Sequence, residues 1–256
     1  DDNPPWVRSF QTEEEFLSVF SRDPLDFSQG ICPQVTERYR YYQEVLKDFS
    51  RLRTSIQVVL PDLQGPLDTL ELLRGSAIYE DFILEPERTD LALQRIAQAQ
   101  AGFATHLQPF TTDGTEGFSR QHATVIKGNI LIRNDSAIMI SPEMYSVQVA
   151  PHDEFVLREM GGGGVHSCGK IDFNVPEIFR LPSIQCFDFG QSYLNDLEPV
   201  YELAKEKKIP LIRIRADREE LLSGSIMKRF PTGVSLVYEA ASFEEAQYVA
   251  EYYCFE

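Results

Sequence analysis

The strongest constraint on the fold is a unit that repeats over the last ninety residues. Each unit is a short apolar strand, a loop, and a helix that begins at a capping residue. The strands are predicted over 183–188, 210–215 and 234–238. Asp217 and Ser242 are the expected N-caps of two of the helices, because acidic residues follow each of them. Strands that alternate with helices need crossover connections, which predicts a parallel sheet.

Two earlier segments extend this pattern. Ser55–Leu60 is rich in β-branched residues and is predicted as the first strand, and Asn129–Arg133 as another. Helices are predicted around Leu67–Leu73, from Pro86 to Phe110, and after Ser141. About six strands are expected, and none is followed by Gly-x-Gly-x-x-Gly. We therefore expect a (β/α)8 TIM-type barrel rather than a doubly wound sheet, with one or two strands missing before residue 55.

A run of four glycines, Gly161–Gly164, leads into Val165-His166-Ser167-Cys168-Gly169. Glycine is costly inside a helix, so the run ends the preceding helical segment and starts a short strand. In an extended chain His166 and Cys168 point to the same side. Imidazole and thiolate are ligands that zinc accepts. The alternative is a buried histidine beside a buried thiol, since free cysteine is among the most buried residues.

Net charge, apolar runs and cysteine spacing limit which partners the protein can bind and where in the cell it is expected. The 24 basic residues against 40 acidic ones give a net charge of −16, which argues against nucleic acid and anionic membranes as partners. No apolar run reaches the roughly 18 residues of a membrane helix. The cysteines, Cys32, Cys168, Cys186 and Cys254, show no paired spacing, and the N-terminus shows no signal-peptide pattern. We therefore expect reduced thiols and a cytoplasmic location.

Four segments, in their order along the chain, resemble those of one known family. They are Asp2-Asn3-Pro4-Pro5 with the helix that carries Tyr39, Tyr41 and Tyr42; Gln64-Gly65-Pro66-Leu67 with Leu73-Arg74-Gly75; Asn134 to Tyr145; and His166-Ser167-Cys168-Gly169. Together they resemble the uroporphyrinogen decarboxylase superfamily, which includes the cobalamin-dependent methyltransferases. The resemblance implies one partial (β/α)8-type barrel domain over residues 1–256. It also implies that the N-terminal part of a full-length member, with its first strand, lies outside this sequence.

The resemblance also bears on the metal. Methyltransferases of the superfamily carry a His-x-Cys zinc pair with a later cysteine as a further ligand, whereas the tetrapyrrole decarboxylases lack the pair. His166 and Cys168 therefore imply zinc and favour the methyltransferase branch. At the expected place of the third ligand this chain has Glu239, and carboxylates serve in catalytic zinc sites. Neither later cysteine falls at that place, because Cys254 lies in the last predicted helix and Cys186 lies on a predicted strand.

Four further residues are candidates because they lie at the predicted carboxyl ends of strands, where barrels place their active sites. Asp135 is a candidate base or orienting group, or alternatively the cap of a turn. Asp188 is a candidate catalytic residue that would orient a metal-bound histidine. Arg213 and Arg215 share one face of a strand and are candidates for binding substrate carboxylates. Pairing with acids outside the barrel is the alternative for both.

Three functions are consistent with these residues. The favoured one is a zinc-dependent methyltransferase that activates a thiol, with methylcobalamin or a corrinoid protein as the methyl donor. The alternative is a metal-independent lyase, a decarboxylase that acts on a tetrapyrrole or another polycarboxylate. The second alternative is a degenerate barrel that binds a ligand without chemistry. A small-molecule substrate is expected for the first two, and a homodimer is left open.

Overall fold

Six parallel strands form the main sheet of the protein, whose computed structural model describes residues 7–10, 12–112 and 117–253. Every pair of neighbouring strands is parallel. In spatial order the strands are β1 (Leu63–Gln64), β4 (Ile130–Arg133), β5 (Gly163–Ser167), β6 (Ile184–Phe189), β7 (Leu211–Arg215) and β8 (Val234–Val237). The carboxyl ends of all six therefore lie along one edge of the sheet, where the predicted site residues are found.

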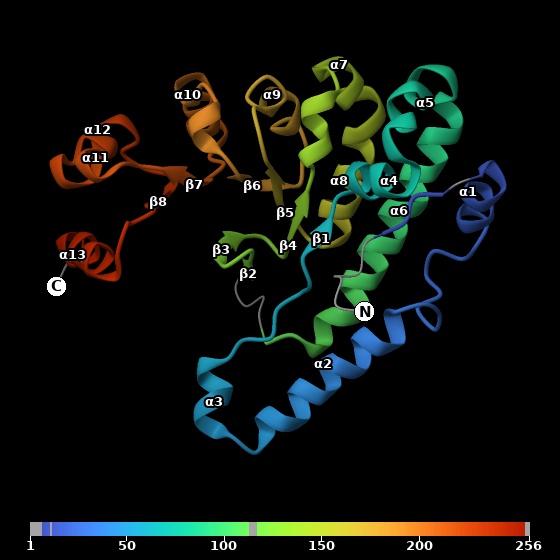
Figure 1. Cartoon of the computed structure of the whole chain (residues 1–256), viewed down its shortest axis with the longest axis horizontal. Coiled ribbons are helices and arrows are strands. Elements are labelled where there is room, and N and C mark those ends of the chain that lie inside the picture. The colour runs from blue at the N-terminus through green and yellow to red at the C-terminus, as the bar shows by residue number, and fades with distance from the viewer. Residues whose placement is uncertain (1–6, 11, 113–116, 254–256) are drawn as a thin grey trace.

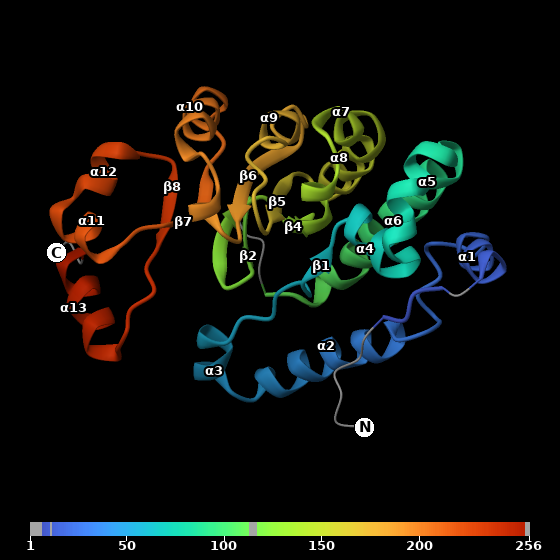
Figure 2. The same ribbon diagram turned by 45° about the horizontal axis from the view of Figure 1, so that its top comes forward.

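Helices connect the strands and lie along one side of the sheet, whereas α2 and α3 lie on the other side (Figures 1 and 2). Proline occupies the first turn of several of them, where its missing N–H is not needed. The connecting helices are α4 (Pro66–Arg74), α5 (Ile78–Leu84), α6 (Pro86–Leu107), α7 (Pro142–Met144), α8 (Ala150–Glu159), α9 (Val175–Ile178), α10 (Leu197–Lys207), α11 (Arg218–Ser223), α12 (Ser225–Arg229) and α13 (Phe243–Tyr253). The N-terminal helices are α1 (Glu13–Phe20), α2 (Cys32–Lys47) and α3 (Ser50–Ser55). No helix in the described ranges combines the length and the apolar character that crossing a membrane requires.

The alternation of side chains in the strands divides the interior into two parts. Ile130, Ile132 and Val165 point toward the helices and belong to the main apolar core. Leu131 and Cys186 point to the opposite face, where they form a second, smaller cluster. Because the strands are parallel and in register, the residues further along on this second face also converge.

An antiparallel hairpin covers the second face. Its strands are β2 (Phe118–Gln121) and β3 (Thr124–Lys127), and Ile126 packs into the small cluster with Leu131, Cys186 and Ile212. The chain returns from the hairpin into β4 through Gly128. Gly128 has a φ of +100° and lies so close to β5 that a Cβ on it would be 2.5 Å from the Gly163 Cα. The hairpin is thus seated against the sheet and brings its turn toward the strand ends.

The α/β class is confirmed, and several helix boundaries agree with prediction. Ser141 caps α7 by accepting a hydrogen bond from the Met144 N–H, and Asp217 and Glu220 form the capping box of α11. The observed sheet is an open one: β1 and β8 stand at its two ends, and no strand pairing within the described part of the chain joins them. The (β/α)8-type barrel that lacks its first strand therefore stays a prediction, and the observed architecture is a six-stranded parallel sheet.

The prediction of a strand over Ser55–Leu60 is wrong. Ser55 ends α3, and the segment after it forms no strand. The Val58 N–H donates to Thr112 Oγ1 (2.9 Å) and the Thr112 N–H donates to the Val58 carbonyl (2.8 Å), so an extended segment meets only a loop. The first strand is instead β1, just beyond Pro61. β-branched residues favour an extended backbone, but whether a strand forms depends on the neighbouring segment.

Candidate functional site

His166 lies at the carboxyl end of β5, and the glycine run explains why its strand can lie there. β5 begins at Gly163, so two of the four glycines belong to the strand rather than to the turn before it. A Cβ on Gly164 would lie 2.4 Å from the Cys186 Sγ, and one on Gly163 would lie 2.2 Å from the Ile130 carbonyl oxygen. The strand is therefore packed between β4 and β6 at a distance that only glycine permits, with His166 almost fully buried above it.

Asp188 orients His166. It lies on β6 directly beside His166 in the strand register, and its side chain is completely buried. Its Oδ2 is 2.9 Å from His166 Nδ1, and Arg213 Nε donates to its Oδ1 at 2.6 Å. Burial alone would raise the pKa of Asp188, but hydrogen bonds from His166 and Arg213 outweigh it and hold the pKa below the ordinary value. Asp188 is thus a buried carboxylate with two fixed partners.

Arg213 reaches this carboxylate because β7 is irregular. Arg213 has a φ of +60°, which is rare for a residue with a side chain, and the register between β7 and β8 shifts in this region. In a regular strand Arg213 would point the same way as Leu211, into the helix-side core. The left-handed backbone turns it to the other face, where it forms an ion pair with Asp188.

His122, which the sequence analysis did not identify, completes the buried side of the site. It occupies the turn of the β2–β3 hairpin, where His122 and Ala123 both have positive φ values, 50° and 59°. Its Nδ1 lies 2.7 Å from Arg213 Nη2, and its ring meets the His166 ring edge-on, with 5.0 Å between the ring centroids. Burial lowers the pKa of His122, and the charge of Arg213 lowers it further.

A sequence signal for this hairpin exists in three consecutive β-branched residues, Thr124, Val125 and Ile126, which favour an extended backbone. The turn itself carries no signal, because two-residue hairpin turns normally use Asn-Gly or Asp-Gly rather than His-Ala.

Cys168 and Asp135 lie on the other side of the His166 ring. Asp135 begins the short 3-10 helix η3 (Asp135–Met139) after β4, and its Oδ1 accepts a hydrogen bond from the Cys168 N–H at 2.6 Å. His166 Nε2 is 3.4 Å from Cys168 Sγ and 3.7 Å from Asp135 Oδ1. Burial raises the pKa of the Cys168 thiol, and the neighbouring Asp135 carboxylate raises it further. These ligand atoms lie within 4.8 Å of one another, so together they could hold a metal ion.

Asp68, near the start of α4, fixes the segment that carries Asp135. Its two carboxylate oxygens accept hydrogen bonds from the backbone N–H groups of Asp135 (2.9 Å) and Ser136 (2.8 Å). Burial raises the pKa of Asp68 to about 6 despite these hydrogen bonds. The position of Asp135 is therefore set by a buried acid on a neighbouring element.

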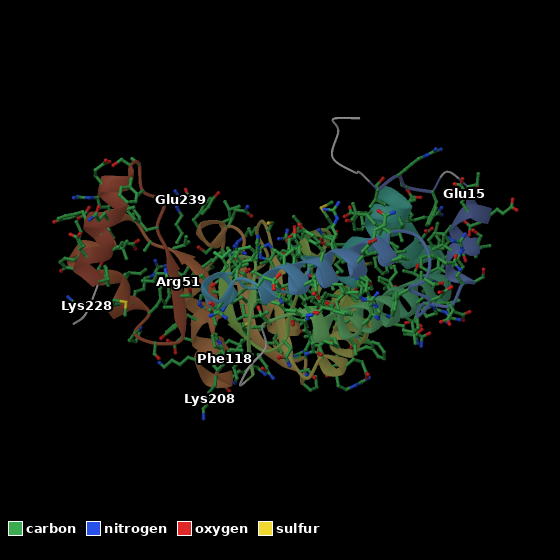
Figure 3. All side chains as sticks on the ribbon, turned by 90° about the horizontal axis from the view of Figure 1, so that it is seen from below. Glu15, Arg51, Phe118, Lys208, Lys228 and Glu239 are labelled. Carbon is green, nitrogen blue, oxygen red and sulfur yellow. The ribbon has the colours of Figure 1, made fainter. Side chains whose placement is uncertain are left out.

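Two predicted residues lie apart from the His166 cluster, which consists of His166 and the residues around it described above: His122, Asp135, Cys168, Asp188 and Arg213. Glu239 follows β8, is 72% exposed, and forms an ion pair with Arg215 at 3.3 Å; Figure 3 labels it in the C-terminal part of the chain. Two groups of described residues could hold a metal ion, and Glu239 belongs to neither of them: His122, His166 and Asp188 form one, and Asp135, His166 and Cys168 form the other. In the second group a carboxylate of Asp135 stands where Glu239 was expected. Arg215 stacks over the Tyr193 ring, 5.0 Å from its centroid, and makes no contact with the His166 cluster that the structure records. Cys254 lies outside the described residues.

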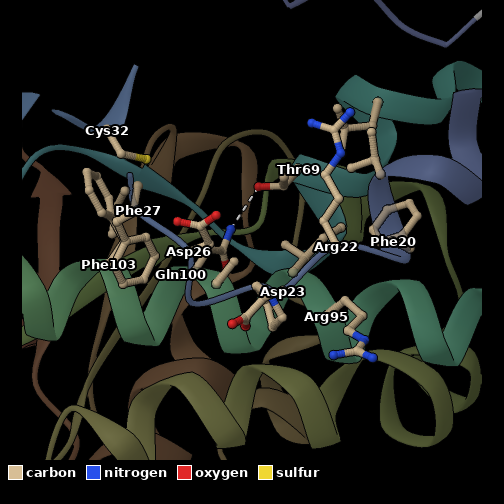
Figure 4. A pocket seen from close by; sticks show the side chains of 16 residues that line it. Phe20, Arg22, Asp23, Asp26, Phe27, Cys32, Thr69, Arg95, Gln100 and Phe103 are labelled. Carbon is tan, nitrogen blue, oxygen red and sulfur yellow. Dashed lines mark hydrogen bonds between the residues drawn. The ribbon is translucent and has the colours of Figure 1, made fainter. Parts of the chain in front are cut away.

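A cavity of about 390 Å³ lies elsewhere, between the segment after α1 and the helices α4 and α6 (Figure 4). Its wall is largely apolar and includes Phe20, Phe27 and Phe103, with Gln100 donating a hydrogen bond to Thr69 at 2.8 Å. The cavity shares no residue with the His166 cluster.

Neither a scan against protein-family models nor a search of curated proteins returns a match for this chain.

Proposed function

We propose that His166, Cys168 and Asp135 form a zinc site that activates a substrate thiol. The observation that supports this proposal is the spacing of the three ligand atoms. Neighbouring N, S and O ligands of a tetrahedral zinc ion lie about 3.4–3.6 Å apart, given the usual zinc–ligand bond lengths. The His166 Nε2 atom is 3.4 Å from the Cys168 sulfur and 3.7 Å from an Asp135 oxygen. Three protein ligands leave one tetrahedral position open, as in catalytic sites.

Each surrounding residue has a definite task in this proposal. Asp188 holds Nδ1 of the His166 ring and so directs Nε2 toward Cys168 and Asp135. Arg213 holds Asp188 in its charged form. Asp135 is 39% exposed, which places the site at the surface of the strand ends, where a small molecule can reach it. A zinc ion bound there supplies positive charge that lowers the pKa of a substrate thiol.

The same residues are the basis for proposing the protein superfamily to which the chain belongs. The six parallel strands would be part of a (β/α)8-type barrel of the uroporphyrinogen decarboxylase superfamily, in its methyltransferase branch. The methyl donor would then be methylcobalamin or a corrinoid protein, and the acceptor a small thiol. What favours this branch is that His166 and Cys168 converge on one point together with a carboxylate.

The decarboxylase remains the second candidate, and Arg215 is the residue that favours it. Arg215 is 44% exposed and paired only with the exposed Glu239 in the described part of the chain, so a substrate carboxylate could replace that partner. Arg213 contributes less than predicted, because the buried Asp188 already engages it.

Zinc content tests the proposal. Cys168→Ser should remove stoichiometric zinc from the purified protein, because a thiolate ligand is lost. Asp135→Asn should weaken zinc binding while leaving the neighbouring hydrogen bond to Cys168 largely intact. Cys32→Ser is the matched control, since Cys32 lies on α2, away from the cluster. Zinc-free parent protein, or equal zinc in Cys168→Ser and parent, would refute the site and leave the decarboxylase or the degenerate barrel.

A further inference from the structure

The group around Arg213 has more partners than hydrogens. One of its terminal nitrogens, Nη2, contacts Asp188 Oδ2, lies 2.7 Å from His122 Nδ1, and lies 2.9 Å from His166 Nδ1. A guanidinium nitrogen of this kind carries two hydrogens, which point in two fixed directions in the guanidinium plane. At most two of the three contacts can therefore be hydrogen bonds donated by Arg213.

The geometry decides which two they are. Asp188 takes one hydrogen, because Arg213 Nε donates to the second oxygen of the same carboxylate and the pair is forked. His122 Nδ1 is the closer of the two ring nitrogens and takes the other. His166 Nδ1 must then carry its own hydrogen, which it donates to Asp188 Oδ2 at 2.9 Å.

We propose that His122 is a positioning residue that fixes the tautomer of His166. By accepting the second hydrogen of Arg213 Nη2, His122 keeps that hydrogen from His166 Nδ1. The neutral His166 ring is then protonated on Nδ1, and Nε2, which faces Cys168 and Asp135, keeps its lone pair. This inference rests on the proposed function, because the tautomer matters most where Nε2 has to bind a metal.

The backbone supports this assignment. His122, Ala123 and Arg213 all have positive φ values, which are unfavourable for residues with a Cβ. His122 and Ala123 form the hairpin turn, and His122 contacts Arg213 of β7. Ile126 and Gly128 anchor the same hairpin against the sheet. Strained residues persist where the surrounding packing holds them, and here the packing holds His122 against Arg213.

The experiment measures the tautomers directly in metal-free protein. Nitrogen-15 spectra distinguish protonated from bare ring nitrogens, and the chain has only four histidines to assign. The measurement is made at about pH 8, above the ordinary histidine pKa of about 6.5. In the parent we expect opposite tautomers: a proton on Nδ1 of His166 and on Nε2 of His122. The same tautomer in both rings, or the reverse arrangement, would overturn the inference without any variant.

Two variants at the same position separate the hydrogen bond from the fold. His122→Gly removes the acceptor but suits the left-handed backbone, so His166 should shift toward the Nε2-protonated tautomer and zinc affinity should fall by about 10- to 100-fold. His122→Asn keeps an acceptor near the Nδ1 position and also tolerates this backbone, so it should restore both readouts. An unchanged Ile126 amide resonance shows that the hairpin stays seated.

The outcomes distinguish this inference from the proposed function. If His122→Gly leaves the tautomer of His166 unchanged, or His122→Asn disturbs it equally, the role of His122 is refuted even where zinc binds. If the tautomers behave as expected but the parent binds no zinc, the zinc site is refuted and the positioning role of His122 stands.

Discussion

At the scale of single residues, the site depends on acids that are buried behind it. Asp153, on α8, is completely buried, and its Oδ2 accepts hydrogen bonds from Asn134 (2.6 Å) and Tyr145 (2.8 Å). The Asn134 N–H in turn bonds to the His166 carbonyl at 2.8 Å. Burial, with a smaller contribution from Asp68, raises the pKa of Asp153 to about 7. Below about pH 7, therefore, a neutral carboxyl supports the end of β4 beside the site.

This shift predicts how stability depends on pH. In the unfolded chain Asp153 ionises near its ordinary pKa of 3.8, whereas in the folded protein it keeps its proton up to about pH 7. The unfolded state therefore binds fewer protons in this range, and the free energy of unfolding falls as pH rises from about 4 to about 7. Asp153→Asn removes a contribution of at most about 4 kcal/mol to this fall.

Urea unfolding at about pH 4, 5.5 and 7.5 measures the effect. Asp68, whose pKa is raised to about 6, contributes a fall of the same sign in both proteins, so the variant should keep a smaller slope rather than none. An equal slope in Asp153→Asn and parent would show that Asp153 is ionised in the folded state throughout the range.

At the scale of elements, β5 shows that glycine has two separate uses within one run. Gly162 has a φ of +107° and makes the turn after α8, whereas Gly163 and Gly164 are strand residues without space for a Cβ. Composition shows that the run breaks a helix, but only the neighbouring strands show where the run becomes a strand. For this reason the site-bearing strand starts two residues earlier than the sequence predicts.

Alanine substitutions separate these two uses. Gly164→Ala should destabilise the protein by about 1–3 kcal/mol or more, because its Cβ meets Cys186 and Leu131 in a packed interior. Gly224→Ala is the comparison: its φ is +69°, yet a Cβ there meets open space, so about 1 kcal/mol is expected. Thermal or urea unfolding of both variants is the measurement, and a larger loss in Gly224→Ala would mean that backbone conformation outweighs close packing here.

At the scale of the whole molecule, the sequence predicts the features that local rules determine. The helix from Pro86, the cap at Ser141, and the shared face of His166 and Cys168 result from proline geometry, capping and strand alternation. These rules also bring Asp135 and Asp188 to the strand ends beside His166. Local rules were sufficient because the helix start, the cap and the strand alternation depend on residues close in sequence, and parallel strands place their carboxyl ends at one edge of the sheet.

Features that depend on distant neighbours were not predictable. Arg213 turns to the site face only because its backbone is left-handed, which strand alternation does not anticipate. Glu239 was placed by counting from a family pattern, but the chain after β8 leads it to the surface beside Arg215. His122 comes from a hairpin that precedes β4 and lies far from His166 in the sequence, and no local signal connects the two rings.

The seating of the β2–β3 hairpin also has a consequence for the order of folding. The hairpin can pair its own strands locally, but Ile126 finds its neighbours only after β4, β6 and β7 have assembled. We therefore expect the hairpin to dock after the main folding barrier, so that Ile126→Ala speeds unfolding and leaves the folding rate nearly unchanged, with a φ-value near zero. Stopped-flow kinetics provide the measurement, and a φ-value near one would place the hairpin in the folding nucleus. In that order of folding, the hairpin that carries His122 docks last and completes the candidate site.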